Sequence, residues 1–105
     1  MDKDKIYLQE IMEFCEKVTN FVAGVSYEQF IEDEKTQLAV IKLIENIGEA
    51  SKRLSPDIKA RYPKVDWSQA AKMRDRLTHH YMDVDLAIVF DVAINEIPKL
   101  FGHLK

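Results

Sequence analysis

The segment from Val84 to Phe101 constrains the fold more than any other part of the sequence. Its apolar residues occur at almost every angular position of a helix. A helix that is apolar on all sides must be covered on all sides. In a chain of 105 residues, this pattern predicts either a central place in the core or contact with a second copy of the chain. Pro98 has no N–H to donate, so it should kink or locally open this helix.

The remainder of the chain also has apolar residues at helical spacing, and alternation typical of strands is scarce. Glycine and proline are rare, with three of each. These features predict an all-α fold in a single domain spanning residues 1–105. The first expected helix covers residues 3–21, and the second covers residues 26–54, with Ser26 as its cap and a bend near residues 32–34. A short helix begins at Ser55–Pro56, with Ser55 as its cap, and ends at Tyr62–Pro63. The helix over residues 69–80 is capped by Asp66 or Ser68, and the last helix by Asp83 or Asp85.

Gly48 stands inside the second expected helix, where glycine costs about 1 kcal/mol relative to alanine. Close approach of another backbone, or of a substrate, would account for that cost. Glu45 and Glu49 are four residues apart, and two like charges at this spacing repel unless a cation lies opposite them. Arginines elsewhere in the chain could supply that cation, or both glutamates could simply be exposed.

The composition, 47% hydrophobic and 31% charged, is typical of a soluble globular protein. A run of about 18 apolar residues is absent, so no transmembrane helix is expected. The charged start of the chain is unlike a signal peptide. Cys15 is the sole cysteine and cannot form an internal disulfide, which agrees with a reducing cytoplasm. We therefore expect a cytoplasmic protein in which Cys15 is a small buried apolar group.

Positive charge is concentrated in one part of this acidic chain. The net charge is −3, yet residues 52–80 hold eight basic against three acidic residues, a balance of +5. A local basic patch on an acidic protein can still bind phosphates. Solvated surface charge without any partner is the alternative.

The densest chemistry lies within residues 73–81 of that basic region. Arginine offers a fork of donors that matches phosphate oxygens, and histidine exchanges protons near neutral pH. Such a combination suits metal-free cleavage of a phosphodiester. The candidates are Arg74, Asp75, Arg76, His79, His80 and Tyr81.

On a straight helix these residues would not all meet. Arg74 and Tyr81 would share a face, and Asp75 could touch His79. Arg74 and His79 would lie about 140° apart around the axis. Either the helix loosens near His79, or Arg74 reaches along it, or two copies of the chain complete the site. A solvated basic helix end is the alternative without function.

The sequence Arg74, four residues, His79, one residue, Tyr81 resembles the Arg-x4-His-x-Tyr motif of HepT-type toxins in the HEPN ribonuclease superfamily. The resemblance extends over most of the chain and is weak before residue 35. It includes residues 47–55, the Tyr62–Pro63 to Trp67 stretch, and residues 83–100. It implies a HEPN-like antiparallel four-helix bundle with a short extra helix, assembled as a homodimer.

The resemblance also implies a function, a toxin of a type VII (HepT/MntA) toxin–antitoxin system that acts as a metal-independent endoribonuclease. His79 would take the proton of a ribose 2′-hydroxyl and Arg74 would hold the phosphate. Asp75 would orient His79, whereas Arg76 and His80 would contact the RNA backbone or be merely exposed. Glu49 would support the arginines. No cofactor, metal or membrane is expected.

The same resemblance implies a partner, an MntA-like nucleotidyltransferase antitoxin that transfers AMP from ATP to Tyr81. The added charge and bulk beside Arg74 would block RNA. Two other interpretations stay open. One is a non-catalytic helical dimer that binds a nucleotide or a nucleotidyltransferase partner, and the other is a metal site formed by Asp75, His79 and Asp83.

Overall fold

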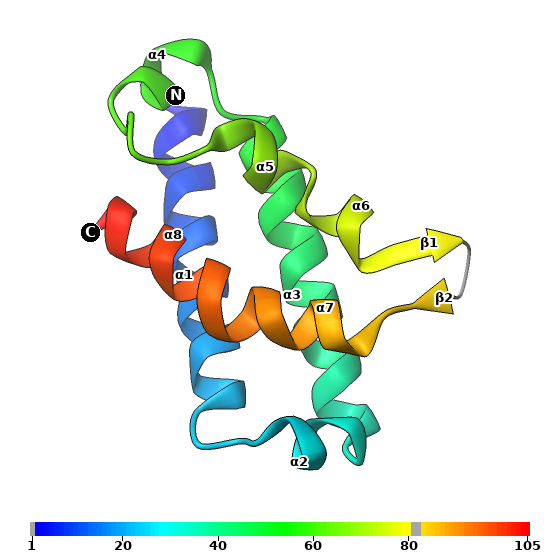
Figure 1. Ribbon diagram of the computed structural model, residues 1–105. Helices are drawn as coiled ribbons and strands as arrows, with labels where there is room; N and C mark the ends of the chain where they lie inside the picture. Colours follow the sequence, from blue (N-terminus) through cyan, green and yellow to red (C-terminus); the bar gives the residue numbers. More distant parts are fainter. Residues whose placement is uncertain (1, 81–82) are drawn as a thin grey trace.

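The computed structural model describes the backbone of residues 2–80 and 83–105, and the side chains of residues 2–77 and 84–105. It is helical almost throughout, which confirms the all-α prediction (Figure 1). The helices are α1 (Lys3–Val22), α2 (Tyr27–Ile31), α3 (Glu34–Lys52), α4 (Pro56–Ala60), α5 (Trp67–Ala71), α6 (Met73–Leu77), α7 (Leu86–Asp91), the π-helical turn η1 (Val92–Glu96) and α8 (Ile97–Leu104). Two short antiparallel strands, β1 (Thr78–His80) and β2 (Asp83–Val84), lie between α6 and α7. Within the described residues, none of the helices has both the length and the apolar character that crossing a bilayer requires.

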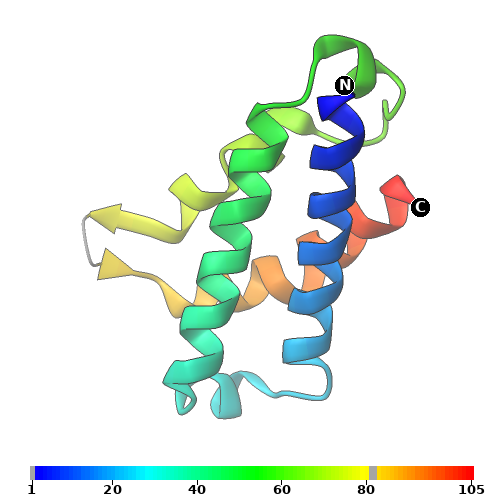
Figure 2. The ribbon, with the colours of Figure 1, turned by 180° about the vertical axis from the view of Figure 1, so that it is seen from behind.

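The two long helices, α1 and α3, run antiparallel and side by side (Figures 1 and 2). The continuous run α7–η1–α8 crosses both of them, in front in Figure 1 and behind in Figure 2. Helices α5 and α6 pack against α3, and the β1–β2 hairpin extends from the end of α6. The residues with the candidate chemistry therefore lie where α6 leaves the bundle.

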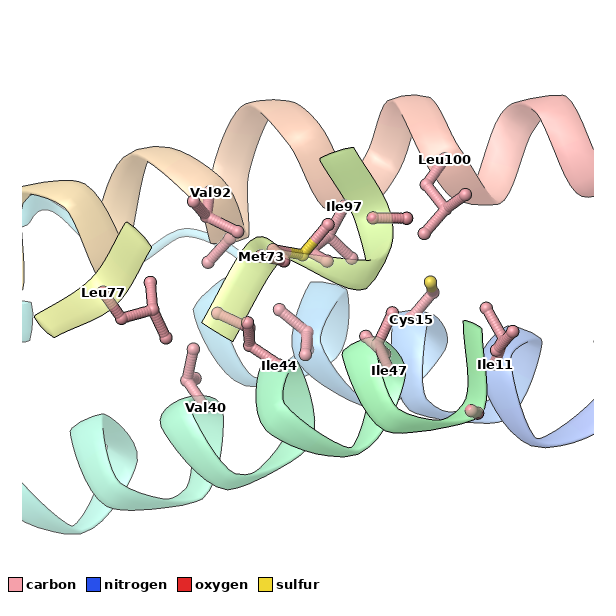
Figure 3. Packing of buried hydrophobic residues seen from close by; sticks show 14 of the residues in the cluster. Ile11, Cys15, Val40, Ile44, Ile47, Met73, Leu77, Val92, Ile97 and Leu100 are labelled. Carbon is pink, nitrogen blue, oxygen red and sulfur yellow. The ribbon is translucent and has the colours of Figure 1, made fainter. Parts of the chain in front are cut away.

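One hydrophobic core joins these helical runs (Figure 3). Each run contributes side chains that are at most 6% exposed. They include Ile11, Cys15 and Val18 of α1, Val40, Ile44 and Ile47 of α3, Met73 and Leu77 of α6, and Val92, Ile97 and Leu100 of the C-terminal run. The core thus holds α6 against α3 and fixes the base of the candidate site.

The C-terminal run is covered on one side more fully than on the other. Val89, Val92 and Ala93 are completely buried, whereas Ile94 is 42% exposed. The prediction that this helix is central to the core is therefore confirmed for one face. Its other face keeps exposed apolar surface within a single chain.

Cys15 lies in the core with no exposed surface, as predicted. Burial raises the pKa of its thiol to about 12, because the charged thiolate would lose its hydration. The residue therefore acts as a small apolar side chain.

Several helix starts follow the predicted capping residues. Ser26 forms a reciprocal capping box with Gln29, and Ser55 accepts the N–H of Ile58. Where the sequence left two alternatives, Asp66 caps α5 and Asp85 caps α7. These short-range hydrogen bonds satisfy backbone donors that a helix start would otherwise leave unpaired.

The prediction of one continuous helix over residues 26–54 was wrong, because the structure has two helices there. The chain forms α2 and then α3, and the break falls at residues 32–33, where the bend was expected. Asp33 causes it by capping the new helix, because its carboxylate accepts the Thr36 N–H at 3.1 Å and the Thr36 hydroxyl at 2.6 Å.

The prediction of a motif helix over residues 69–80 was also wrong. The helix is interrupted at Lys72 and ends at Leu77, after which Thr78–His80 is a strand. In a continuous helix the Leu77 carbonyl would accept a hydrogen bond from the N–H four residues further along the chain. Here it accepts the Asp85 N–H at 3.0 Å, so the returning strand β2 takes the place of the next helical turn.

Pro98 has the predicted effect on the last helix. The turn before it is π-helical, and the N–H of Ile97 bonds to the carbonyl of Val92, five residues earlier. Proline removes the donor that the Ile94 carbonyl would otherwise receive, and a wider turn is one way to accommodate that loss. The opened turn carries Glu96, whose carboxylate contacts side chains of α5 and α6.

Candidate functional site

Arg74 projects from α6 toward α3, with 52% of its side chain exposed. Its NH1 lies 3.8 Å from Glu49 Oε1, and its Nε lies 4.0 Å from Asp75 Oδ1. Glu49 also receives Lys52 Nζ at 3.4 Å. Of the two alternatives for Glu49, the motif thus supplies a cation opposite it, although the Glu49 side chain is also 46% exposed. Both contacts to Arg74 are long for an arginine–carboxylate pair, which leaves its guanidinium accessible to another anion.

Gly48 brings α3 close enough for this contact. A Cβ at this position would lie 3.4 Å from the Ala71 carbonyl oxygen and 3.6 Å from that of Ala70, and 4.0 Å from the Arg74 nitrogen. The prediction that Gly48 permits close approach of another backbone is confirmed. The α5–α6 junction packs directly on this glycine, and the next residue along α3 meets Arg74.

Arg76, on the same short helix, points to a different partner. Its NH1 donates to Glu96 Oε1 at 2.6 Å, and the same oxygen accepts Gln69 Nε2 at 3.0 Å. The two motif arginines are therefore held by different helices, Arg74 by α3 and Arg76 by η1. Glu96 and Gln69 were not predicted, since no local spacing connects either of them to the motif. Pro98, which indicated an opened turn next to Glu96, was the one hint in the sequence.

His79 and His80 lie in β1, outside any helix. The backbone pairing places Thr78 opposite Val84 and His80 opposite Asp83, with an irregular register between them. The alternative that the helix loosens near His79 is therefore confirmed. The separation of about 140° that a straight helix would impose on Arg74 and His79 does not apply.

Two other expectations depended on helical spacing, namely that Asp75 touches His79 and that Arg74 shares a face with Tyr81. Both lose that basis because the helix ends at Leu77. Asp75, 63% exposed, contacts Arg74, but the helix ends before His79, so the four-residue spacing no longer brings these two together. Tyr81 lies outside the described residues, as do the side chains of His79, His80 and Asp83. The roles of these residues, and the metal site of Asp75, His79 and Asp83, stay predictions.

Two hollows flank the candidate site among the described residues. A cavity of about 280 Å³ lies between α5 and the C-terminal run, with Gln69, Met73, Glu96, Lys99 and His103 in its lining. A shallower hollow between α1 and α3 is bordered by Tyr7, Phe14, Glu49 and Arg53. Arg74 lines neither hollow, and its half-exposed side chain lies on the surface beside Glu49.

Comparison with known proteins then decides the family. A family model described as ribonuclease HepT-like matches residues 11–105, which covers the core, the Arg74 region and the hairpin. The chain belongs to the ribonuclease HepT-like family.

Individual relatives of the HepT-like family agree over nearly the whole chain. A protein of Thermococcus cleftensis named "Probable ribonuclease HepT" is 41% identical over 101 residues, which is 96% of this chain and 92% of the relative. A protein of Methanocaldococcus jannaschii named as an inferred RNase is 38% identical over 95 residues, covering 90% of this chain and 78% of the relative. Another so named, from Caldanaerobacter subterraneus, is 35% identical over 105 residues, covering 100% of this chain and 94% of the relative. No solved structure matches the chain significantly.

Proposed function

We propose that this HepT-like protein is an endoribonuclease that cleaves RNA without a metal ion. The observation that carries the proposal is the family match over residues 11–105, together with relatives named as ribonucleases. The surface of α6 supports it, because Arg74 is half-exposed and bound only loosely by Glu49 and Asp75. A phosphate could form shorter, charge-assisted hydrogen bonds to this guanidinium than either carboxylate does.

In the proposed reaction, His79 takes the proton from a ribose 2′-hydroxyl, whose oxygen attacks the adjacent phosphorus. The bond from phosphorus to the 5′-oxygen breaks, and that oxygen receives a proton from a general acid. The products are a 2′,3′-cyclic phosphate and a 5′-hydroxyl end. Arg74 stabilises the negative charge that accumulates on the phosphate oxygens. DNA lacks the 2′-hydroxyl and should be inert.

The active protein is proposed to be a homodimer in which two such sites face one cleft. Apolar surface on the C-terminal run supports this, since Ile94 is 42% exposed and Leu86, Ile88 and Phe90 are only partly buried. The second copy would supply the general acid and a second Arg74. Sedimentation equilibrium at micromolar concentration should give twice the mass of the chain, and a stable monomer would contradict the proposal.

The biological role is proposed to be that of a toxin neutralised by an MntA-like nucleotidyltransferase. That partner would transfer AMP from ATP to Tyr81. In this proposal, which rests on the resemblance to the Arg-x4-His-x-Tyr motif, the adenylyl phosphate attached to Tyr81 would stand near Arg74. It would compete with RNA for Arg74 by charge and by bulk.

The decisive experiment is cleavage of RNA by the purified protein in excess EDTA. Wild type should cleave, and Arg74→Ala or His79→Ala should each reduce the rate by at least about a hundredfold. Matched controls are Arg61→Ala and His103→Ala, which remove the same side-chain types from the C-terminal cap of α4 and from α8 and should retain activity. The Arg74 variant should fold, since that side chain is half-exposed, and circular dichroism of both variants checks that they keep the helical fold.

The other outcomes separate the alternatives. RNA binding without cleavage, under conditions with and without metal, favours the non-catalytic binding module. Cleavage restored only by adding a divalent metal favours the Asp75–His79–Asp83 metal site. An active Arg74→Ala variant would show that the phosphate-binding residue has been assigned wrongly.

A further inference from the structure

Glu96 joins the two halves of the interrupted motif helix. One of its oxygens, Oε1, accepts Gln69 Nε2 from α5 at 3.0 Å and Arg76 NH1 from α6 at 2.6 Å. The break at Lys72 lies between these two donors in the sequence. A single carboxylate on the C-terminal run therefore spans the point at which the motif helix is discontinuous.

The environment of Glu96 makes this contact depend on Arg76. The Glu96 side chain is 21% exposed, and its second oxygen, Oε2, is buried with no hydrogen-bond partner among the described residues. A largely desolvated carboxylate is unfavourable unless a cation compensates it. Arg76 supplies that cation, so the pair should remain formed and should resist displacement by an RNA phosphate.

The position of Glu96 follows from the π-helical turn. Residues Val92–Glu96 form η1, and Pro98 is the second residue of α8, which begins at Ile97. A π-turn inserts an additional residue relative to an α-helix and so rotates the side chains after it. Local π-turns often occur at functional sites. Here the turn presents Glu96 to α5 and α6.

Helix α6 is consequently held from two sides. Arg74 contacts Glu49 on α3, and Arg76 contacts Glu96 on η1. The α6 helix has five residues and leads directly into β1, which contains His79. Any rotation of α6 would move Arg74 and the start of that strand together.

We propose that Glu96 is a positioning residue for the ribonuclease site, acting through Arg76 and Gln69 to fix the orientation of α6. Arg76 is then a structural partner of Glu96 and makes no phosphate contact. This inference rests on the proposed function, because it assigns Glu96 a part in presenting Arg74 and His79.

The first test compares Glu96→Ala with Asp91→Ala. Asp91 lies on the same helical run, but its carboxylate accepts a hydrogen bond from Asn95 on that run, so it is a matched control. Glu96→Ala should lower the single-turnover cleavage rate at saturating RNA by about tenfold or more, since small misplacements of catalytic groups are costly. The Kd for RNA should change by a smaller factor than the cleavage rate, because a displaced Arg74 can still attract phosphate whereas the aligned geometry that the reaction needs is lost. Glu96→Gln keeps the acceptor oxygen and should restore part of the rate.

The second test uses the salt dependence of RNA binding. The slope of log K against log salt is negative, and each lost phosphate contact reduces its magnitude by about 0.7 for single strands. Arg74→Gln should reduce the magnitude by this amount, whereas Arg76→Gln should leave it unchanged. A reduced magnitude for Arg76→Gln would mean that Arg76 binds phosphate, and it would overturn the inference.

A third comparison guards against loss of folding in a single variant. Arg76→Gln leaves the Glu96 carboxylate without its cation, so combining it with Glu96→Gln should recover both cleavage rate and thermal stability. Additive effects of the two changes would contradict the coupling. A cleaving wild type with a fully active Glu96→Ala variant would overturn this inference alone, whereas a wild type that cleaves no RNA would overturn the proposed function as well.

Discussion

Gly48 offers the sharpest test of how the fold positions Arg74. Replacement by alanine should stabilise the protein, whereas replacement by valine should destabilise it. The two changes differ by two methyl groups, so the comparison probes the gap between α3 and the α5–α6 junction.

The expected change in the free energy of unfolding for Gly48→Ala has two contributions. Glycine inside a helix costs up to about 1 kcal/mol relative to alanine, and α3 continues on both sides of Gly48. The added Cβ would meet its nearest neighbour, the Ala71 carbonyl oxygen, at 3.4 Å, which is an ordinary van der Waals distance. We therefore expect a gain of about 0.5–1 kcal/mol and a rise in Tm of roughly 4 °C.

Valine would add two carbon atoms beyond a Cβ that already touches backbone. The Ala70 and Ala71 carbonyls cannot rotate away as a long side chain could. Overpacking of this kind costs about 1–3 kcal/mol, and the displaced junction would carry Arg74 away from Glu49. Valine at this position should therefore reduce ribonuclease activity as well as stability.

Thermal and urea unfolding, followed by circular dichroism, measure these effects. Gly102 is the matched control, since it lies in α8 and a Cβ there would meet nothing within 4 Å. Alanine and valine should both be tolerated at Gly102. If the valine variant at Gly48 were as stable as the alanine variant, the close approach of the two backbones would be refuted. A destabilising alanine would refute the expected gain in stability, because it would show that even a Cβ 3.4 Å from the Ala71 carbonyl oxygen is not accommodated.

Three further predictions concern single residues. Cys15 should react with a thiol reagent only on unfolding, and rapid labelling of the folded protein would contradict this. Because burial raises its pKa to about 12, the unfolded chain loses the thiol proton first, and the free energy of unfolding should fall as pH rises above the ordinary thiol value of 9.0. Two hydrogen bonds from Ser55 hold the pKa of Asp4 below its ordinary value of 3.8. The difference in stability between wild type and Asp4→Asn should therefore persist above pH 3.8 and shrink as pH falls through the lowered pKa. Chemical denaturation at pH 7 and pH 3 measures this difference, and an equal difference at both pH values would contradict the prediction. Tyr81→Phe should still cleave RNA but gain no AMP from a cognate nucleotidyltransferase and ATP, as intact mass would show; equal modification of wild type and variant would rule Tyr81 out.

Local chemistry made much of the fold predictable from the sequence. Ser26, Ser55 and Asp85 cap helices as predicted, because a capping side chain bonds to an N–H two or three residues away. The burial of Cys15 and the opening of the helix before Pro98 were likewise predictable, since periodicity and the missing proline donor act within about one turn.

The geometry of the candidate site depended on contacts that no local rule reaches. The motif helix ends at Leu77 because the Leu77 carbonyl is taken by Asp85, which arrives from the returning strand. A short segment with good helical spacing can adopt either structure, and the tertiary pairing determines which one forms.

The partners of the motif arginines show the same division. The sequence alone determined that Arg74 and Arg76 lie in a basic motif, and it left open whether Glu49 meets a cation or is simply exposed. The tertiary structure decided that Arg74 meets Glu49 while Arg76 pairs with Glu96, 20 residues further on. Side-chain spacing along a helix predicts neighbours one turn away, whereas pairing between helices depends on how the core packs them. In this protein the packing brings Glu49 of α3 to Arg74 and Glu96 of η1 to Arg76.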